Sequence, residues 1–415
     1  MNDHARTRHR SRARPRLPLL LAILTLAACD KDPVLVGDDD DAFTPRTSVV
    51  LPVEGAGTFA GRYTAEIAAR GSWIYTTTWG FRTATGNALV IWEASGAVPV
   101  LRDTVIVNGA TTLGDVQISD DGDLLVVATE RSGGSIVIFD RTTPDHLVQL
   151  SRFATAATNP GVHTVKLGRV NGRHYAFLQI DPGNSVNAQL VIADITDPAA
   201  PTQVFVRPMG KPFVHDVFVR DGLLFTALWD DGMTIWDIGG GGKGGTPANP
   251  VEIGNVKTVD GNVHNIWWFH DPNTGSKRWV FIGEEGPGSV GASSSGDIHV
   301  VDVSDMADPR EVAFYHVPGA GTHNFVMDEA SQILFAAYYN GGVRALDVRG
   351  DLGACDEAAR SSDGRCDLAL AGREAARALD DRQVSVWGVA RVGTTIYASD
   401  MLSGVFRIDA STLAR

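Results

Sequence analysis

The chain has 415 residues, 44% of them hydrophobic, and its 49 Asp and Glu outnumber its 36 Lys and Arg, which gives a formal net charge of −13. Residues 1–28 hold six of the arginines and one Asp, so the remainder carries 30 basic and 48 acidic residues, a net charge of about −18. This balance excludes binding of nucleic acid, or of an anionic membrane, through a basic face.

The N-terminus predicts export. Six arginines within residues 6–16 precede an apolar stretch at 17–28 that is too short to span a bilayer. The stretch ends in LAAC (26–29), which resembles the bacterial lipobox, where the Cys is lipidated and becomes the new N-terminus. The resemblance implies a membrane anchor on Cys29 and a place in the cell envelope, facing the periplasm or the cell surface. The alternative is an ordinary signal peptide followed by an incidental Cys.

Residues 29–46 predict an acidic tether, because the four consecutive Asp at 38–41 repel one another and stay solvated. A strand-like segment, TSVVLPV (47–53), comes next. The folded part is predicted to span 47–415 and to be a monomer. No later segment reaches about 18 continuous apolar residues, so the lipid is the only membrane contact predicted.

From residue 63 onward the chain repeats one unit of short apolar strands joined by turns. A repeat of roughly 40–55 residues is typical of radial or stacked architectures. Strands rich in Val, Ile and aromatic residues, separated by Gly, Asp and Asn, predict an all-β protein. The acids that end the third strands are predicted to form turns. The clearest copies are these third strands: ALVIWE (88–93), SIVIFD (135–140), LVIADI (190–195), MTIWDI (233–238), IHVVDV (298–303), VRALDV (343–348) and VFRIDA (405–410).

Seven such units predict a seven-bladed β-propeller. The seventh unit has no fourth strand of its own, so the segment at 47–53 is predicted to complete the last blade and close the ring. A solenoid is the alternative, although no capping repeats are seen. The units cover about 63–108, 114–154, 161–207, 213–257, 262–317, 322–349 and 385–410.

Two insertions interrupt the repeat. The first, GGGGKGG (239–245), is predicted to be a flexible linker, because no GK[ST] follows it to form a phosphate loop. The second, 350–384, holds Cys355 and Cys366. In an exported protein this pair predicts a disulfide, with a metal or redox pair as the alternative. Its segment DLALAGREAARALD (367–380) has the composition and apolar spacing of a short amphipathic helix.

The third strand followed by an Asp-Pro turn resembles the LVIVD repeat of bacterial and archaeal surface proteins. The closest copies are QLVIADITDPAAPTQV (189–204) and DIHVVDVSDMADPREV (297–312). The resemblance covers most of residues 60–410 and implies a propeller on an exported protein. It implies no particular activity, since members of the family are mostly uncharacterised.

Four histidines share one register, near the start of the first strand of consecutive units. The first strand of a propeller blade is innermost, so its start lies at one mouth of the central channel. Antiparallel pairing brings the end of the second strand beside it. These second-strand ends supply carboxylates and aromatic residues. The histidines are His163, His215, His264 and His323, and the second-strand ends carry Trp229, Asp230, Glu284, Glu285 and Tyr339, while Trp387 takes the histidine position in the last unit.

Imidazole and carboxylate together are the ligands of a divalent transition metal. The sequence therefore predicts a metal site of the four histidines with Glu284 or Glu285, and ligand contacts from Trp229, Asp230, Tyr339 and Trp387. Neighbouring residues of a strand point to opposite faces, so only one of the two glutamates is expected to face the channel. The alternative is that the histidines hydrogen-bond between blades, with their register fixed by duplication, and that the aromatic residues pack between blades.

Two functions follow from these predictions. The first is an envelope binding or interaction module with a protein or small-molecule ligand at the propeller face. The second is a metal-dependent enzyme with redox or hydrolytic chemistry at the channel mouth. The sequence has no G-x-S-x-G, dinucleotide fingerprint or HExxH. Geometry discriminates between the two, because at least three imidazoles must approach one point at about 2.0–2.2 Å from a metal.

Overall fold

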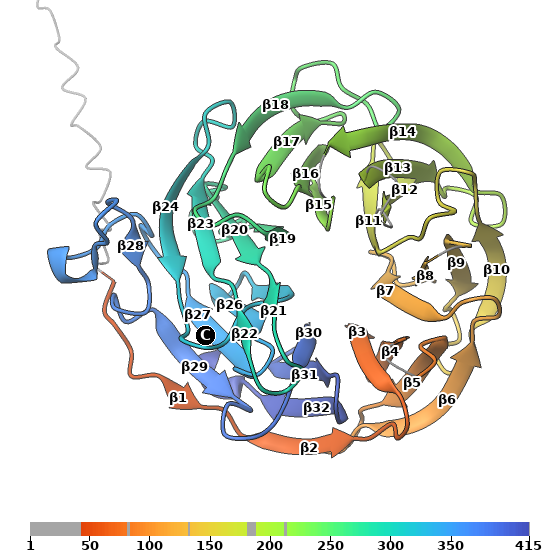
Figure 1. The fold of residues 1–415 in the computed structure, drawn as a ribbon, viewed down its shortest axis with the longest axis horizontal. Coiled ribbons are helices and arrows are strands. Elements are labelled where there is room, and N and C mark those ends of the chain that lie inside the picture. Colours follow the sequence, from red (N-terminus) through yellow and green to blue (C-terminus); the bar gives the residue numbers. More distant parts are fainter. Residues whose placement is uncertain (1–42, 81–83, 132, 181–187, 211–213, 415) are drawn as a thin grey trace, which may run out of the picture. The chain divides into compact units, whose positions relative to one another are not determined.

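The computed structural model describes residues 43–80, 84–131, 133–180, 188–210 and 214–414. They belong to one compact unit, Ala42–Arg415. Its strands form seven sheets of four or five strands around a central opening (Figure 1). The predicted all-β, seven-bladed propeller is therefore confirmed. The predicted signal peptide, Cys29 and residues 29–42 of the tether lie outside the described residues.

Each blade has four antiparallel strands that run outward from the channel, in chain order except in blade seven, where the outermost strand comes from the N-terminal end of the described chain. The innermost strands are β3 (Tyr63–Arg70), β7 (Thr112–Ile118), β11 (Thr164–Val170), β15 (Val217–Arg220), β19 (Val263–Trp268), β25 (Phe325–Asp328) and β30 (Val386–Val392). The second strands are β4 (Trp73–Trp79), β8 (Leu124–Glu130), β12 (Arg173–Ile180), β16 (Leu223–Ala227), β20 (Trp279–Glu284), β26 (Ile333–Ala337) and β31 (Thr395–Asp400).

The third strands are those that the repeat predicts. They are β5 (Ala88–Glu93), β9 (Ser135–Asp140), β13 (Ala188–Asp194), β17 (Met233–Asp237), β23 (Ile298–Asp302), β27 (Val343–Asp347) and β32 (Gly404–Asp409). The outermost strands are β6 (Val100–Ile106), β10 (Val148–Phe153), β14 (Thr202–Gly210), β18 (Val251–Val256), β24 (Arg310–Tyr315), β29 (Glu374–Ala378) and, in blade seven, β2 (Val53–Gly57).

The hydrophobic core is divided into seven clusters, and each lies between two neighbouring blades. Phe177 of blade three, for example, belongs to one buried cluster with Leu224 and Trp236 of blade four. Because neighbouring blades cover both faces of the third strands, these strands are continuous apolar runs instead of alternating ones. The rigid stack of blades holds the channel-lining strands in place.

The N-terminal strand closes the ring, as predicted, although it is displaced along the chain. Val53–Gly57 (β2) pairs antiparallel with β32 and completes blade seven. The two residues β1 (Val49–Val50), within the predicted strand, instead pair parallel with β29 on the outer edge of blade six. The second strand, β2, and the last strand, β32, thus share one sheet.

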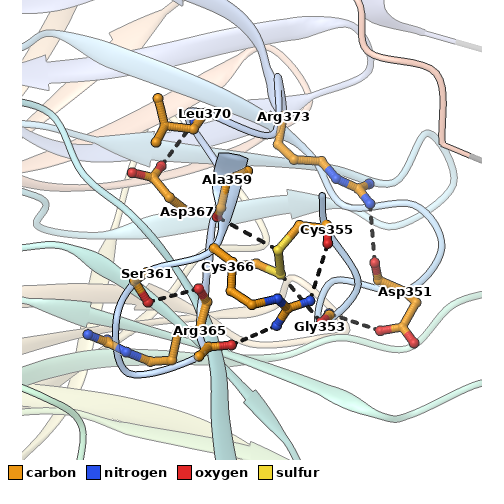
Figure 2. Close-up of a disulfide and its surroundings, with 12 residues drawn as sticks. Asp351, Gly353, Cys355, Ala359, Ser361, Arg365, Cys366, Asp367, Leu370 and Arg373 are labelled. Atoms are coloured by element: carbon orange, nitrogen blue, oxygen red, sulfur yellow. Dashed lines mark hydrogen bonds between the residues drawn. A yellow bond between two sulfur atoms is a disulfide. The ribbon is translucent and has the colours of Figure 1, made fainter. Parts of the chain in front are cut away.

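The second insertion fastens blades five and six from outside. Figure 2 shows the disulfide between Cys355 and Cys366, which the sequence predicted. The short strand β28 (Cys366–Asp367) pairs parallel with β24 of blade five, and η1 (Glu357–Ala359) lies between the two cysteines in the chain.

The predicted helix at 367–380 is wrong. Glu374–Ala378 forms β29, the outer strand of blade six, which pairs with β27 on one side and β1 on the other. Gly372 has φ +70, which turns the chain before the strand. Composition favours a helix here, but the open edge of β27 provides backbone partners that override that propensity. The helices in the described part of the chain are the short 3-10 helices η1 and η2 (Ser411–Leu413). No described helix is long and apolar enough to span a bilayer.

The acids at the ends of the third strands form turns, as predicted. Asp140, for instance, accepts a hydrogen bond from the Thr142 N–H. Asp237 goes further, because its carboxylate accepts four backbone N–H groups of the glycine-rich segment, at residues 239, 241, 243 and 245. That segment is therefore not a free linker. Burial opposes ionisation of Asp237, but the four N–H groups lower its pKa to about 2.

Candidate metal centre

β-bulges direct the predicted histidines into the channel. The His215 N–H donates to the Ala227 carbonyl, and the Ala227 N–H donates to the carbonyl of Asp216, so two residues face one. A bulge re-aims its side chains, and here both His215 and Asp216 line the channel. The pattern recurs in the next two blades, at His264–Asn265 and His323–Asn324.

The four imidazoles form one row across blades three to six. Ring centroids are 4.4 Å apart between His163 and His215, 4.0 Å between His215 and His264, and 4.2 Å between His264 and His323. The structure thus brings together all four histidines that the sequence placed at one mouth.

Glu285 lies among the imidazoles. Its Oε2 is 3.6 Å from His215 Nε2 and 3.7 Å from His264 Nε2, and its Oε1 is 3.9 Å from His323 Nε2. His163 Nε2 is 3.0 Å from His215 Nε2. The ligand atoms of His215, His264 and Glu285 all lie within 4.8 Å of one another.

These separations fit a metal ion. Four ligand atoms placed tetrahedrally at about 2.1 Å from zinc are about 3.4 Å apart. The separations from Glu285 Oε2 to His215 and His264 lie within about 0.3 Å of that value. His163 and His323 do not belong to the group of described ligand atoms that all lie within 4.8 Å of one another, so a third imidazole would have to move toward the centre to complete the site.

His264 is buried in the row with both ring nitrogens unsatisfied by the described part of the chain. Its side chain is 2% exposed, and neither ring nitrogen has a hydrogen-bond partner among the described residues. A buried polar group without a partner is costly and uncommon. A metal ion would provide the partner for Nε2.

His323, at one end of the row, is oriented by its second nitrogen, since its Nδ1 donates to the Trp387 carbonyl at 2.6 Å. A hydrogen bond at Nδ1 fixes the tautomer that leaves a lone pair on Nε2, which is how proteins orient metal-binding histidines. At the other end, His163 Nδ1 lies 3.2 Å from Glu130 Oε1, within ion-pair distance.

The buried imidazoles are held neutral, as metal ligands must be. Burial, with the neighbouring imidazoles, holds the pKa of His215 and of His264 well below the usual value. Burial likewise lowers the pKa of His323 to about 3, although the Trp387 carbonyl opposes the change. At neutral pH these rings offer lone pairs and no positive charge.

The predicted aromatic residues surround the row. The Tyr339 hydroxyl donates to Glu285 Oε1, the Trp387 ring centroid is 4.6 Å from that of His323, and Trp229 stacks on His215 at 5.5 Å. Trp229 and Tyr339 both have positive φ, 56° and 41°. Each forms a backbone bridge to the next blade, directly before the histidine or tryptophan position. Strained backbone of this kind is often found at functional sites.

Two predicted residues lie elsewhere. Glu284 points away from the row, where its Oε2 is 3.4 Å from His299 Nε2, so Glu285 is the glutamate that faces the channel. Asp230 is exposed on its turn and lies outside the cavity wall. The alternation of a strand explains the first result, since adjacent side chains point to opposite faces.

The row lies in a cavity of about 440 Å³. Beside the histidines its wall includes three acids that sequence reasoning missed: Glu66, Asp115 and Asp216. Burial raises the pKa of all three, with the charge of Asp115 adding to the effect at Glu66, and Asp216 reaches about 7 although Lys166 opposes the change. The hairpin of β21 (Gly286–Pro287) and β22 (Ser294–Ser295), an insertion in blade five, contributes Pro287 and Ser293 to the wall.

One signal could have revealed Asp216. Each histidine of the row is followed by a short polar residue, Thr164, Asp216, Asn265 or Asn324. A repeated His-polar pair in a strand, where alternation should send the second residue outward, indicates a bulge. Glu66 and Asp115 belong to blades without a histidine and carry no such signal.

The LVIVD repeat family model matches residues 185–206 and 213–258. The chain therefore contains LVIVD repeats, as its third strands predicted. The second match covers blade four and includes His215 and Asp216. No curated protein matches the sequence.

Proposed function

We propose that this protein is an exported, lipid-anchored propeller that binds a divalent transition metal in its channel, through His163, His215, His264, His323 and Glu285. Imidazole ligands suit zinc, copper, iron and nickel, and one carboxylate offsets part of the charge of the ion. The observation that carries the proposal is His264, a fully buried imidazole without hydrogen bonds that lies 3.7 Å from a carboxylate and between two other imidazoles.

The metal would be enclosed but accessible. The cavity extends beyond the histidines, so a bound ion could meet a second ligand from the channel. This arrangement supports a binding module whose ligand is the metal, and it is also what metal-assisted catalysis would need. The envelope part of the proposal rests on the arginine-rich apolar leader, the LAAC sequence and a disulfide, which forms in oxidising compartments.

Metal content tests the proposal directly. Ala42–Arg415, exported to the periplasm and purified without a histidine tag, is expected to carry about one metal ion per chain, measured by mass spectrometry after incubation with Zn, Cu, Fe, Mn or Ni salts. His264→Gln and Glu285→Gln are expected to weaken metal binding by at least about tenfold, because each removes a ligand. His146→Gln, an exposed histidine outside the cavity, is the matched control.

Protein that stays folded and binds none of these metals would overturn the metal centre. Equal loss of metal from the His146→Gln control would show that binding is not at the row. The anchor is tested separately, by metabolic labelling of the full chain with an alkyne-bearing fatty acid. Label on the wild type that Cys29→Ser lacks supports the anchor, and an unlabelled wild type contradicts it.

A further inference from the structure

The cavity holds a second tier of polar side chains that the metal centre does not use. Glu66, Asp115 and Asp216 come from blades one, two and four, and Asn265 and Asn324 follow the histidines of blades five and six. These residues occupy the bulged positions of the innermost strands, so the ring of blades brings them to one level of the channel.

Acid is in excess in this tier. The one Lys or Arg in the cavity wall, among the described residues, is Lys166. Its Nζ lies over the Phe218 ring at 5.7 Å from the centroid, and it forms no ion pair with any described acid. Three carboxyl groups thus share one cation that is not in contact with them. Buried carboxylates are stable only when paired or hydrogen-bonded.

Hydrogen bonds satisfy two of the acids and leave one open. Glu66 accepts the Asn324 side-chain amide at 2.6 Å, and Asp115 accepts the backbone N–H groups of Val116 and Val165 at 2.6 and 3.1 Å.

Asp216 accepts one N–H, from Val217 at its Oδ1, and no described residue donates to its Oδ2. Asn265 is 3% exposed, and its Oδ1, which lacks a hydrogen-bond partner among the described residues, is packed against Gly283 of β20. Asp216 Oδ2 is therefore the acceptor of this tier that is open to a donor from a ligand.

Aromatic rings complete the wall. Trp79 and Trp387 have ring centroids 5.3 Å apart and both line the cavity. Next to Trp387, Gly388 leaves room for Glu66, because a Cβ at 388 would lie 3.1 Å from Glu66 Oε2. Indole faces attract organic cations through the ring quadrupole.

We infer that this tier binds a small organic cation with N–H groups, such as a primary amine, with its ammonium group against Asp216 and its carbon skeleton against the tryptophans. An ammonium group would both donate to the open oxygen of Asp216 and favour its charged form against the effect of burial, whereas neither a neutral nor an anionic ligand would do both. The ligand shares the cavity with the proposed metal but does not depend on it, so the inference goes beyond the proposed function.

Three small ligands that share one ring and differ in charge test the inference. Tyramine, tyrosol and 4-hydroxyphenylacetate share a phenol and differ in a cationic, neutral or anionic end group. Isothermal titration of metal-free Ala42–Arg415 is expected to show tyramine binding at least about tenfold more tightly than tyrosol, with 4-hydroxyphenylacetate weakest. Asp216→Asn is expected to remove the advantage of tyramine, whereas Asp103→Asn, an exposed acid on β6, keeps it.

Equal binding of tyrosol and tyramine, or no binding of tyramine at millimolar concentration, would overturn the inference. The wild-type series decides the question even where Asp216→Asn does not fold. Because the titration uses metal-free protein, a protein that binds metal but ignores tyramine overturns this inference alone. A protein that binds tyramine but no metal overturns only the metal centre.

Discussion

A buried histidine in blade five predicts how stability depends on pH. His299 is 1% exposed, with Nδ1 at 2.8 Å from Glu311 Oε1 and Nε2 at 3.4 Å from Glu284 Oε2. Glu311 also contacts Arg365 of the disulfide insertion. Burial disfavours the imidazolium, but the two carboxylates outweigh burial and raise the pKa of His299 to about 9.

The size and sign of the effect follow from this pKa. The folded value of about 9 lies above the ordinary value of 6.5. Protonation of His299 therefore stabilises the folded state fully below pH 6.5, and the contribution is lost as the pH rises through 9. At about 1.36 kcal/mol per pKa unit, the whole contribution is about 3 kcal/mol.

Urea unfolding of wild type and His299→Gln between pH 6 and pH 10 measures this contribution. The free energy of unfolding of the wild type is expected to exceed that of the variant by up to about 3 kcal/mol near pH 6, and the gap is expected to shrink as the pH passes 9. The exposed His146→Gln should track the wild type throughout. A gap that stays constant from pH 6 to pH 10 would refute the charged His299.

Further substitutions test the hydrogen bonds that fix the glycine-rich segment and the disulfide of the second insertion. Asp237→Ala leaves four backbone N–H groups without their acceptor and should lower the free energy of unfolding by about 2–4 kcal/mol. Asp140→Ala, at the same position of blade two but partly exposed, should lower it by less than about 1 kcal/mol. Equal losses from the two variants would contradict the anchoring of the glycine-rich segment by Asp237. Replacing Cys355 and Cys366 by Ser should lower the thermal midpoint, with a loss of about 2–3 kcal/mol for so short a loop, and a reductant should shift the wild type equally; an unchanged midpoint would show that the clip contributes nothing.

The propeller was predictable because its signal is repeated. Seven third strands with one pattern, and a last unit that lacks an outer strand, predict both the blade number and the closure of the ring. The outer strand of blade six was not predictable in the same way. Residues 374–378 have helical composition and form a strand only because β27 leaves an open edge beside them. Local propensity cannot anticipate a backbone partner 30 residues away in the chain.

The candidate site was predictable in part, for a related reason. Register placed the four histidines at one mouth, and alternation excluded one of the two glutamates. Alternation also hid Asp216, since it predicts that the residue after a channel-facing histidine points away. The bulge breaks this rule, and bulges are set by backbone hydrogen bonds that sequence periodicity does not report.

The bulges also bear on why the histidines are there. Blades one, two and seven form a register shift at the same place in their innermost strands, with Glu66, Asp115 and Trp387 in or beside it. The architecture therefore does not require an imidazole at this position. Packing between blades does not explain His264 either, because a histidine that served to satisfy backbone groups would have hydrogen bonds, and neither of its nitrogens has one among the described residues. Three imidazoles in adjacent blades, held neutral at His215, His264 and His323 and in contact with the carboxylate of Glu285, agree better with the proposed common ligand than with duplication alone.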